Sequence, residues 1–160
     1  MTTLPNQGNI LLEPTSLEDD KPTVLLCDFG MMRLRHGSGP NSTSVEPRSS
    51  LRKPFAAPEL LKLHEQGAEI KPDRPIDVYA FGKTIYTLLT GNEPPAGELG
   101  NDPPNDLAAI IGGRKAHALW AVVKLMTAED PQRRPSMVDS SPGAGDGVMN
   151  DLIKILANFV

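Results

Sequence analysis

The sequence predicts a mainly α domain with a small β-hairpin near its N-terminus. From residue 58 onward, apolar residues recur at helical spacing through most of the chain. Before them stand two short apolar runs, residues 9–12 and 23–27, joined by a polar stretch that contains prolines. Aromatic residues make up only 4% of the chain. Leucine, isoleucine, valine and methionine must therefore supply the core.

In the first half of the chain, prolines and glycines mark the ends of the predicted elements. The two apolar runs predict the paired strands, and the Ser/Gly/Pro/Arg-rich residues 35–50 predict a mobile loop. Pro58 suits the first turn of a short helix that carries three leucines. Pro75 begins a longer helix, which Gly91 ends. Its apolar residues recur on a helical period: Val78, Phe81, Ile85, Leu88 and Leu89.

The second half predicts shorter helices separated by loops. Residues 96–105 form a Gly/Pro/Asn-rich loop, residues 106–111 a short helix, and residues 116–126 a strongly apolar helix with Trp120 in the core. Residues 140–147 predict a flexible linker, and residues 148–160 a final amphipathic helix.

Composition and charge exclude several classes of function. The chain has 160 residues and a net charge of −4, and it shows no basic stripe of the kind that binds nucleic acid. No apolar run is long enough for a membrane span, and the N-terminus lacks a signal-peptide pattern. One cysteine cannot form an intramolecular disulfide. These features favour an intracellular, cytoplasmic protein whose partners are proteins.

Six short motifs follow one another in a specific order. They are Asn9-Ile10-Leu11-Leu12, Asp28-Phe29-Gly30, Ala57-Pro58-Glu59, Asp77 to Gly82, Leu89-Thr90-Gly91 with Pro94-Pro95, and Asp130-Pro131 with Arg134-Pro135. In this order, over residues 4–138, they resemble the C-terminal lobe of a eukaryotic-type protein kinase. The resemblance implies a partial kinase domain over residues 1–139, with a kinase-lobe-like helical fold. It also leaves no counterpart of the N-terminal lobe.

The resemblance implies ATP and Mg²⁺ as cofactors. Phosphoryl transfer needs carboxylate or amide oxygens to hold the metal. The family uses the aspartate at the position of Asp28 and the asparagine at the position of Asn9 for this purpose. Cys27 matches a position that faces the nucleotide. The simpler alternatives are a turn without a ligand for Asp28 and Asn9, and a small buried residue for Cys27.

The catalytic base of the family has no counterpart. The family places an aspartate five residues before the asparagine, and this chain has Leu4 there. Leucine cannot accept a proton from a substrate hydroxyl. Two explanations stay open: the chain is a degenerate kinase, or Met1 is not the ancestral start.

Three charged residues are expected to have structural roles. The family pairs the glutamate at the position of Glu59 with the arginine at the position of Arg134 in a buried ion pair. Arg133 is a competitor by proximity, but the Asp-Pro-x-x-Arg-Pro spacing selects Arg134. By the same resemblance Asp77 accepts backbone N–H groups of the catalytic loop. An acidic residue in the first turn of a helix is also favoured by the helix dipole.

The loop from Met31 to Pro54 resembles a phosphorylatable activation loop. A solvated loop without modification is the alternative of equal weight. Its candidate phosphosites are Ser38, Ser42, Thr43, Ser44, Ser49 and Ser50.

Three interpretations of function follow. The lineage is that of ATP-dependent phosphoryl transfer to protein serine or threonine, with no catalysis expected from this chain by itself. The alternative is a pseudokinase-type protein interaction module without catalysis. A fragment without stable independent function is the third. The surface that would face an N-terminal lobe predicts partner binding or self-association.

Overall fold

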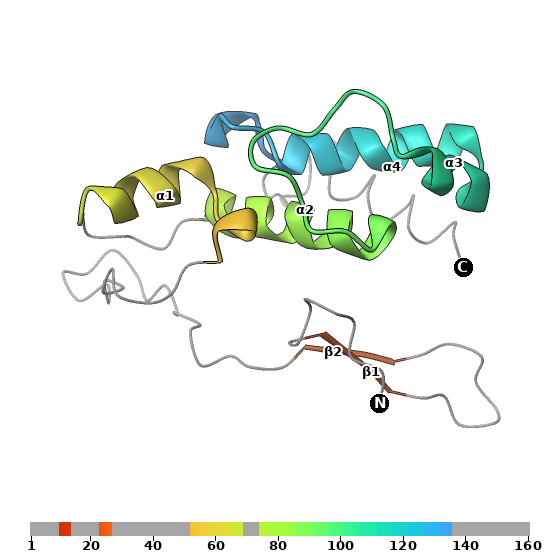
Figure 1. Ribbon diagram of the computed structural model, residues 1–160, viewed down its shortest axis with the longest axis horizontal. Helices are drawn as coiled ribbons and strands as arrows, with labels where there is room; N and C mark the ends of the chain where they lie inside the picture. Colours follow the sequence, from red (N-terminus) through yellow and green to blue (C-terminus); the bar gives the residue numbers. More distant parts are fainter. Residues whose placement is uncertain (1–9, 14–22, 27–51, 69–73, 136–160) are drawn as a thin grey trace, which may run out of the picture. The chain divides into compact units, whose positions relative to one another are not determined.

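The computed structural model describes residues 10–13, 23–26, 52–68 and 74–135 (Figure 1). The chain divides between residues 41 and 42 into two units. The first contains the two described strands and the second all of the described helices, and each unit is considered by itself.

The first unit contains a two-stranded antiparallel hairpin. Strand β1 spans Ile10–Glu13 and strand β2 spans Thr23–Leu26, in a register that pairs Ile10 with Leu26 and Glu13 with Thr23. The predicted hairpin is thus present in the structure. Its predicted outer ends at Asn9 and Cys27 lie outside the described residues.

The second unit is built from four α-helices and two short 3₁₀ segments within its described part (Figure 1). They are η2 (Lys53–Phe55), α1 (Pro58–Glu65), α2 (Arg74–Thr90), α3 (Asn105–Ile111), α4 (Gly113–Met126) and η3 (Pro131–Arg133). Proline opens α1 as the sequence predicts, because its missing N–H would have no partner in the first turn. The predicted mainly α, kinase-lobe-like fold is confirmed. Helix α4 begins three residues earlier than expected.

Helices α2 and α4 lie side by side and enclose the core (Figure 1). Helix α2 ends at Gly91, whose φ of 67° is readily adopted only by glycine. The buried apolar cluster comes mainly from α2 and α4, with Leu99 from the intervening loop and Leu107 from α3. Trp120 is buried as predicted, and its ring centroid lies 5.8 Å from that of Tyr86. Among the described residues, no helix has the length and apolarity that a bilayer crossing needs.

The buried face of α2 differs from the face that its apolar residues suggest. Val78 and Ile85 are buried, but Phe81 and Leu88 remain 41% and 45% exposed. Polar residues share the buried side instead: Tyr79, Lys83 and Thr87. The ammonium of Lys83 and the hydroxyl of Thr87 each donate a hydrogen bond to a backbone carbonyl, and the ring of Tyr79 lies against the guanidinium of Arg134.

At Gly82, α2 lies close to the C-terminal end of α4. A Cβ atom at this position would lie 2.8 Å from both Met126 Cβ and Thr127 Cγ2. The absence of a side chain therefore allows the two helices to meet at this distance.

Candidate functional site

The residues expected to face a nucleotide lie outside the described residues. These are Asp28, Asn9 and Cys27, together with Leu4 at the position of the catalytic base. The candidate phosphosites at 38, 42–44, 49 and 50 also fall there. In the part of the chain that the structure describes, no group of three His, Cys, Asp or Glu side chains could hold a metal ion. The metal and nucleotide assignments therefore remain predictions.

The structure brings together Glu59 of α1 and Arg134 after η3, which are 75 residues apart in the sequence. Arg134 Nη1 lies 2.5 Å from Glu59 Oε1, and Nη2 donates to Oε2 at 2.9 Å. This is the two-pronged geometry in which a guanidinium matches a carboxylate. Arg133 instead lies at the surface, 4.0 Å from Glu98. The pairing is therefore the one that the motif spacing predicts.

Backbone carbonyls occupy the other donors of Arg134. Its Nε donates to the oxygen of Ala128 at 2.8 Å, Nη1 to that of Pro75 at 2.9 Å, and Nη2 to that of Glu129 at 3.1 Å. The side chain of Arg134 is fully buried, whereas that of Glu59 is 27% exposed. Through these bonds a single side chain connects α1, the start of α2 and the segment that follows α4.

The ring of Tyr79 lies beneath this guanidinium. Arg134 Cζ is 4.8 Å from the ring centroid, a cation–π distance. Burial raises the pKa of the Tyr79 hydroxyl above its usual 10, although the nearby Arg134 charge opposes this. Tyr79 therefore stays neutral at physiological pH and stabilises the buried cation through its ring.

The pKa of Glu59 reflects two opposing effects. Burial raises it, but the hydrogen bonds from Arg134 and from the Glu59 backbone, with the positive charge of Arg134, hold the net pKa below the usual 4.5. Since the folded state prefers the carboxylate, the pair contributes its full stability above pH 4.5. This contribution is lost as the pH falls through the lowered pKa of the folded state.

We therefore expect the stability advantage of the native chain over Glu59→Gln to shrink as the pH is lowered from 7 to 3. Urea unfolding at a series of pH values measures this difference. Glu65→Gln is the matched control, because Glu65 is an exposed residue of the same helix. A difference for Glu59→Gln that stays constant down to pH 3 would contradict the assignment.

Asp77 lies in the first turn of α2 and is exposed in the structure. This position suits the favourable interaction of a carboxylate with a helix N-terminus. The catalytic-loop amides that the kinase resemblance assigns to it lie outside the described residues, so that role remains a prediction.

Two further features were not predicted from the sequence, and Lys83 is the first. Lys83 of α2 is completely buried, and its Nζ donates to the carbonyl oxygens of Pro95 and Gly97, both at 2.7 Å. A lysine within an amphipathic helix is ordinarily exposed. The available signal was its position four residues after the buried Tyr79, one turn along the same side of the helix.

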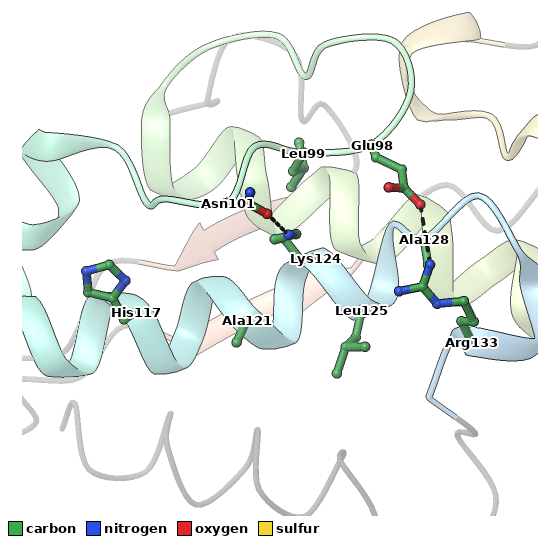
Figure 2. Close-up of a pocket in the computed structure, with 9 residues that line it drawn as sticks. All are labelled: Glu98, Leu99, Asn101, His117, Ala121, Lys124, Leu125, Ala128 and Arg133. Carbon is green, nitrogen blue, oxygen red and sulfur yellow. Dashed lines mark hydrogen bonds and ion pairs between the residues drawn. The ribbon is translucent and has the colours of Figure 1, made fainter.

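The second feature is a groove of about 490 Å³ between α4 and the loop before α3 (Figure 2). Apolar side chains line it along α4, including Ala121 and Leu125, and charged groups stand at its edge. Lys124 Nζ donates to Asn101 Oδ1 at 2.6 Å across one wall of the groove, as Figure 2 shows. Its size is within the range of ligand pockets, but its polar groups are mostly solvent-exposed and do not converge.

Comparisons with known proteins agree with the motif order. Serine/threonine-protein kinase PknJ of Mycobacterium tuberculosis is 33% identical over 137 residues, which cover 79% of this chain and 21% of that kinase. Serine/threonine-protein kinase CTR1 of Arabidopsis thaliana is 29% identical over 136 residues, 79% of this chain and 15% of its own length. A putative ribosomal protein S6 kinase alpha-1 of Caenorhabditis elegans is 31% identical over 140 residues, 79% of this chain and 16% of its own. No protein-family model matches the chain.

The chain spans about a fifth or less of the length of these relatives. The ordered motifs, the helical fold and the similarity over about four fifths of the sequence are all consistent with a kinase-like fragment. Over about four fifths of its sequence the chain is similar to part of several serine/threonine protein kinases, and this similarity, with its helical fold, is that of a kinase-like fragment.

Proposed function

We propose that this chain descends from kinases that transfer phosphate from ATP to protein serine or threonine, and that the chain by itself does not catalyse the transfer. Similarity to serine/threonine kinases supports the lineage. The observation that carries the second half of the proposal is Leu4, which stands five residues before Asn9, where the family has its catalytic aspartate.

Leucine in place of the catalytic aspartate would remove a specific chemical step. In the family, the aspartate orients the substrate hydroxyl and accepts its proton as the phosphoryl group is transferred. An aliphatic side chain can neither accept a proton nor orient a hydroxyl by hydrogen bonding. Within the chain no Asp, Glu or His precedes Glu13, so no neighbouring side chain in that stretch can substitute for the missing base.

The residues proposed to hold the cofactor are Asp28 and Asn9. Carboxylate and amide oxygens are ligands that Mg²⁺ accepts, so the donor types at these positions fit the metal. When bound with ATP, Mg²⁺ would neutralise charge on the phosphates. A chain that retains these donors without the base could still bind nucleotide. This combination favours a pseudokinase-type interaction module as the alternative function.

We expect the purified chain to transfer no radiolabelled phosphate from ATP to a generic protein substrate, because it lacks the base. An active serine/threonine kinase in the same assay serves as the positive control. Mg²⁺-ATP binding measured by calorimetry, for the native chain and Asp28→Asn, separates a nucleotide-binding module from one that binds none. Phosphoryl transfer by the native chain that disappears in Asp28→Asn would overturn the proposal.

A further inference from the structure

The buried ammonium of Lys83 fastens a loop to helix α2. The loop of residues 94–100 follows α2, and the two carbonyls that accept from Lys83 Nζ belong to it. Farther along the same loop, the indole Nε1 of Trp120 donates to the oxygen of Gly100 at 2.9 Å. Leu99, between these two attachment points, is buried in the core. The loop is therefore held at one end by a buried cation and at the other by a tryptophan.

A cation in this position is costly to bury. Two carbonyl oxygens and the ring of Tyr79, whose centroid is 5.2 Å from Nζ, partly replace its hydration. Among the described residues, no carboxylate lies within ion-pair distance of Lys83 to balance its charge. Burial accordingly lowers the pKa of Lys83 from 10.5 to about 8.

We propose that residues 94–100 form a latch that opens more readily when Lys83 is protonated. Opening would return the ammonium to water and release the carbonyls of Pro95 and Gly97. Glu98 and Leu99 line the groove on α4 as well as belonging to the latch. Opening of the latch therefore removes one wall of that groove, which makes the shape of the groove dependent on the charge of Lys83.

The direction of the pH dependence follows from linkage. In the open state Lys83 is hydrated and has its ordinary pKa of 10.5, and in the closed state its pKa is about 8. Between these values the open state binds more protons, so lowering the pH favours opening. These two pKa values give an opening equilibrium about tenfold larger at pH 7 than at pH 9.

The ring centroid of Tyr79 lies 5.2 Å from Lys83 Nζ. Tyr79 has its pKa raised above 10, so it stays neutral between pH 7 and 9. The charged groups that surround Tyr79 are three carboxylates and a guanidinium. They are Glu98 of the loop, Glu129 and Arg134 after α4, and Glu59 of α1. A transition near pH 8 in the latch is therefore assigned to Lys83.

Hydrogen exchange measured by NMR tests the latch. Trp120 is the only tryptophan of the chain, so its indole N–H is an unambiguous reporter of the loop, alongside the backbone amides of residues 97–100. After correction for intrinsic exchange, we expect protection of these groups to rise about tenfold from pH 7 to pH 9. In Lys83→Met, which cannot titrate, protection should be lower at pH 9 and no longer depend on pH.

A direct titration keeps the test decisive if Lys83→Met does not fold. The ¹³Cε shift of Lys83 in the native chain should titrate with a midpoint near pH 8, whereas exposed lysines titrate above pH 10. A midpoint above pH 10 for Lys83 would overturn the proposal. So would loop and indole protection equal to that of the α4 core amides, because the loop would then open only with the whole unit.

Discussion

Replacing Arg134 with methionine is expected to lower the free energy of unfolding by about 3–5 kcal/mol, the range for breaking a buried ion pair. Methionine fills part of the space but donates no hydrogen bond. The change would leave the Glu59 carboxylate unpaired and three carbonyl oxygens without their donor, those of Pro75, Ala128 and Glu129. Because α1, α2 and the segment after α4 meet at this side chain, the loss of its hydrogen bonds affects all three. Urea unfolding at pH 7 measures the change in the free energy of unfolding.

A double-mutant cycle separates the ion pair from the carbonyl contacts. Glu59→Gln removes the negative charge but leaves the carbonyl bonds of Arg134, so its effect should be smaller than that of Arg134→Met. The two substitutions combined should cost less than the sum of their separate effects, because each removes the same ion pair.

Arg133→Met is the matched control for this experiment. Arg133 is the adjacent arginine, and its exposed guanidinium lies 4.0 Å from Glu98. A surface contact of this kind contributes about 0–1 kcal/mol. An effect of Arg134→Met no larger than that of Arg133→Met, with no coupling to Glu59, would refute the structural role of the pair.

The resemblance to protein kinases implied the Glu59–Arg134 pair, because both residues occur in motifs of the family with fixed spacing. Ala-Pro-Glu sets the position of the glutamate at the start of a helix, and Asp-Pro-x-x-Arg-Pro distinguishes Arg134 from Arg133. The helices themselves were predictable for a similar local reason. Pro58 and Gly91 mark helix ends through their own backbone preferences, which act without long-range contacts.

The environment of Lys83 could not be predicted in this way. Its partners are backbone carbonyls 12 and 14 residues away. Every residue has a backbone carbonyl, so residue types do not distinguish the two carbonyls that the fold brings to Lys83. The same limit explains Phe81 and Leu88, which are apolar but exposed on α2. Periodicity predicts which residues share a face of a helix, whereas the folded neighbours determine which face is buried.

The second large effect is expected at Gly82. We predict that Gly82→Ala lowers the free energy of unfolding by about 1–3 kcal/mol, as overpacking of a close contact does. The added Cβ would lie 2.8 Å from Met126 Cβ, an atom fixed to the α4 backbone that cannot rotate away. It would also lie 2.8 Å from Cγ2 of Thr127, a buried residue whose hydroxyl donates to the oxygen of Val123 at 3.0 Å. Relief of these contacts requires α2 and α4 to move apart.

Gly113→Ala provides the control, because it makes the same change in a helix without the contact. A Cβ at Gly113, the first residue of α4, meets no atom within 4 Å. The higher helix propensity of alanine should leave stability unchanged or raise it by up to about 1 kcal/mol. Thermal and urea unfolding of the two variants should therefore move in opposite directions or differ clearly in size. If Gly82→Ala were as stable as Gly113→Ala, the two helices would not be packed as closely as the structure shows, and the core between α2 and α4 would need to be reassigned.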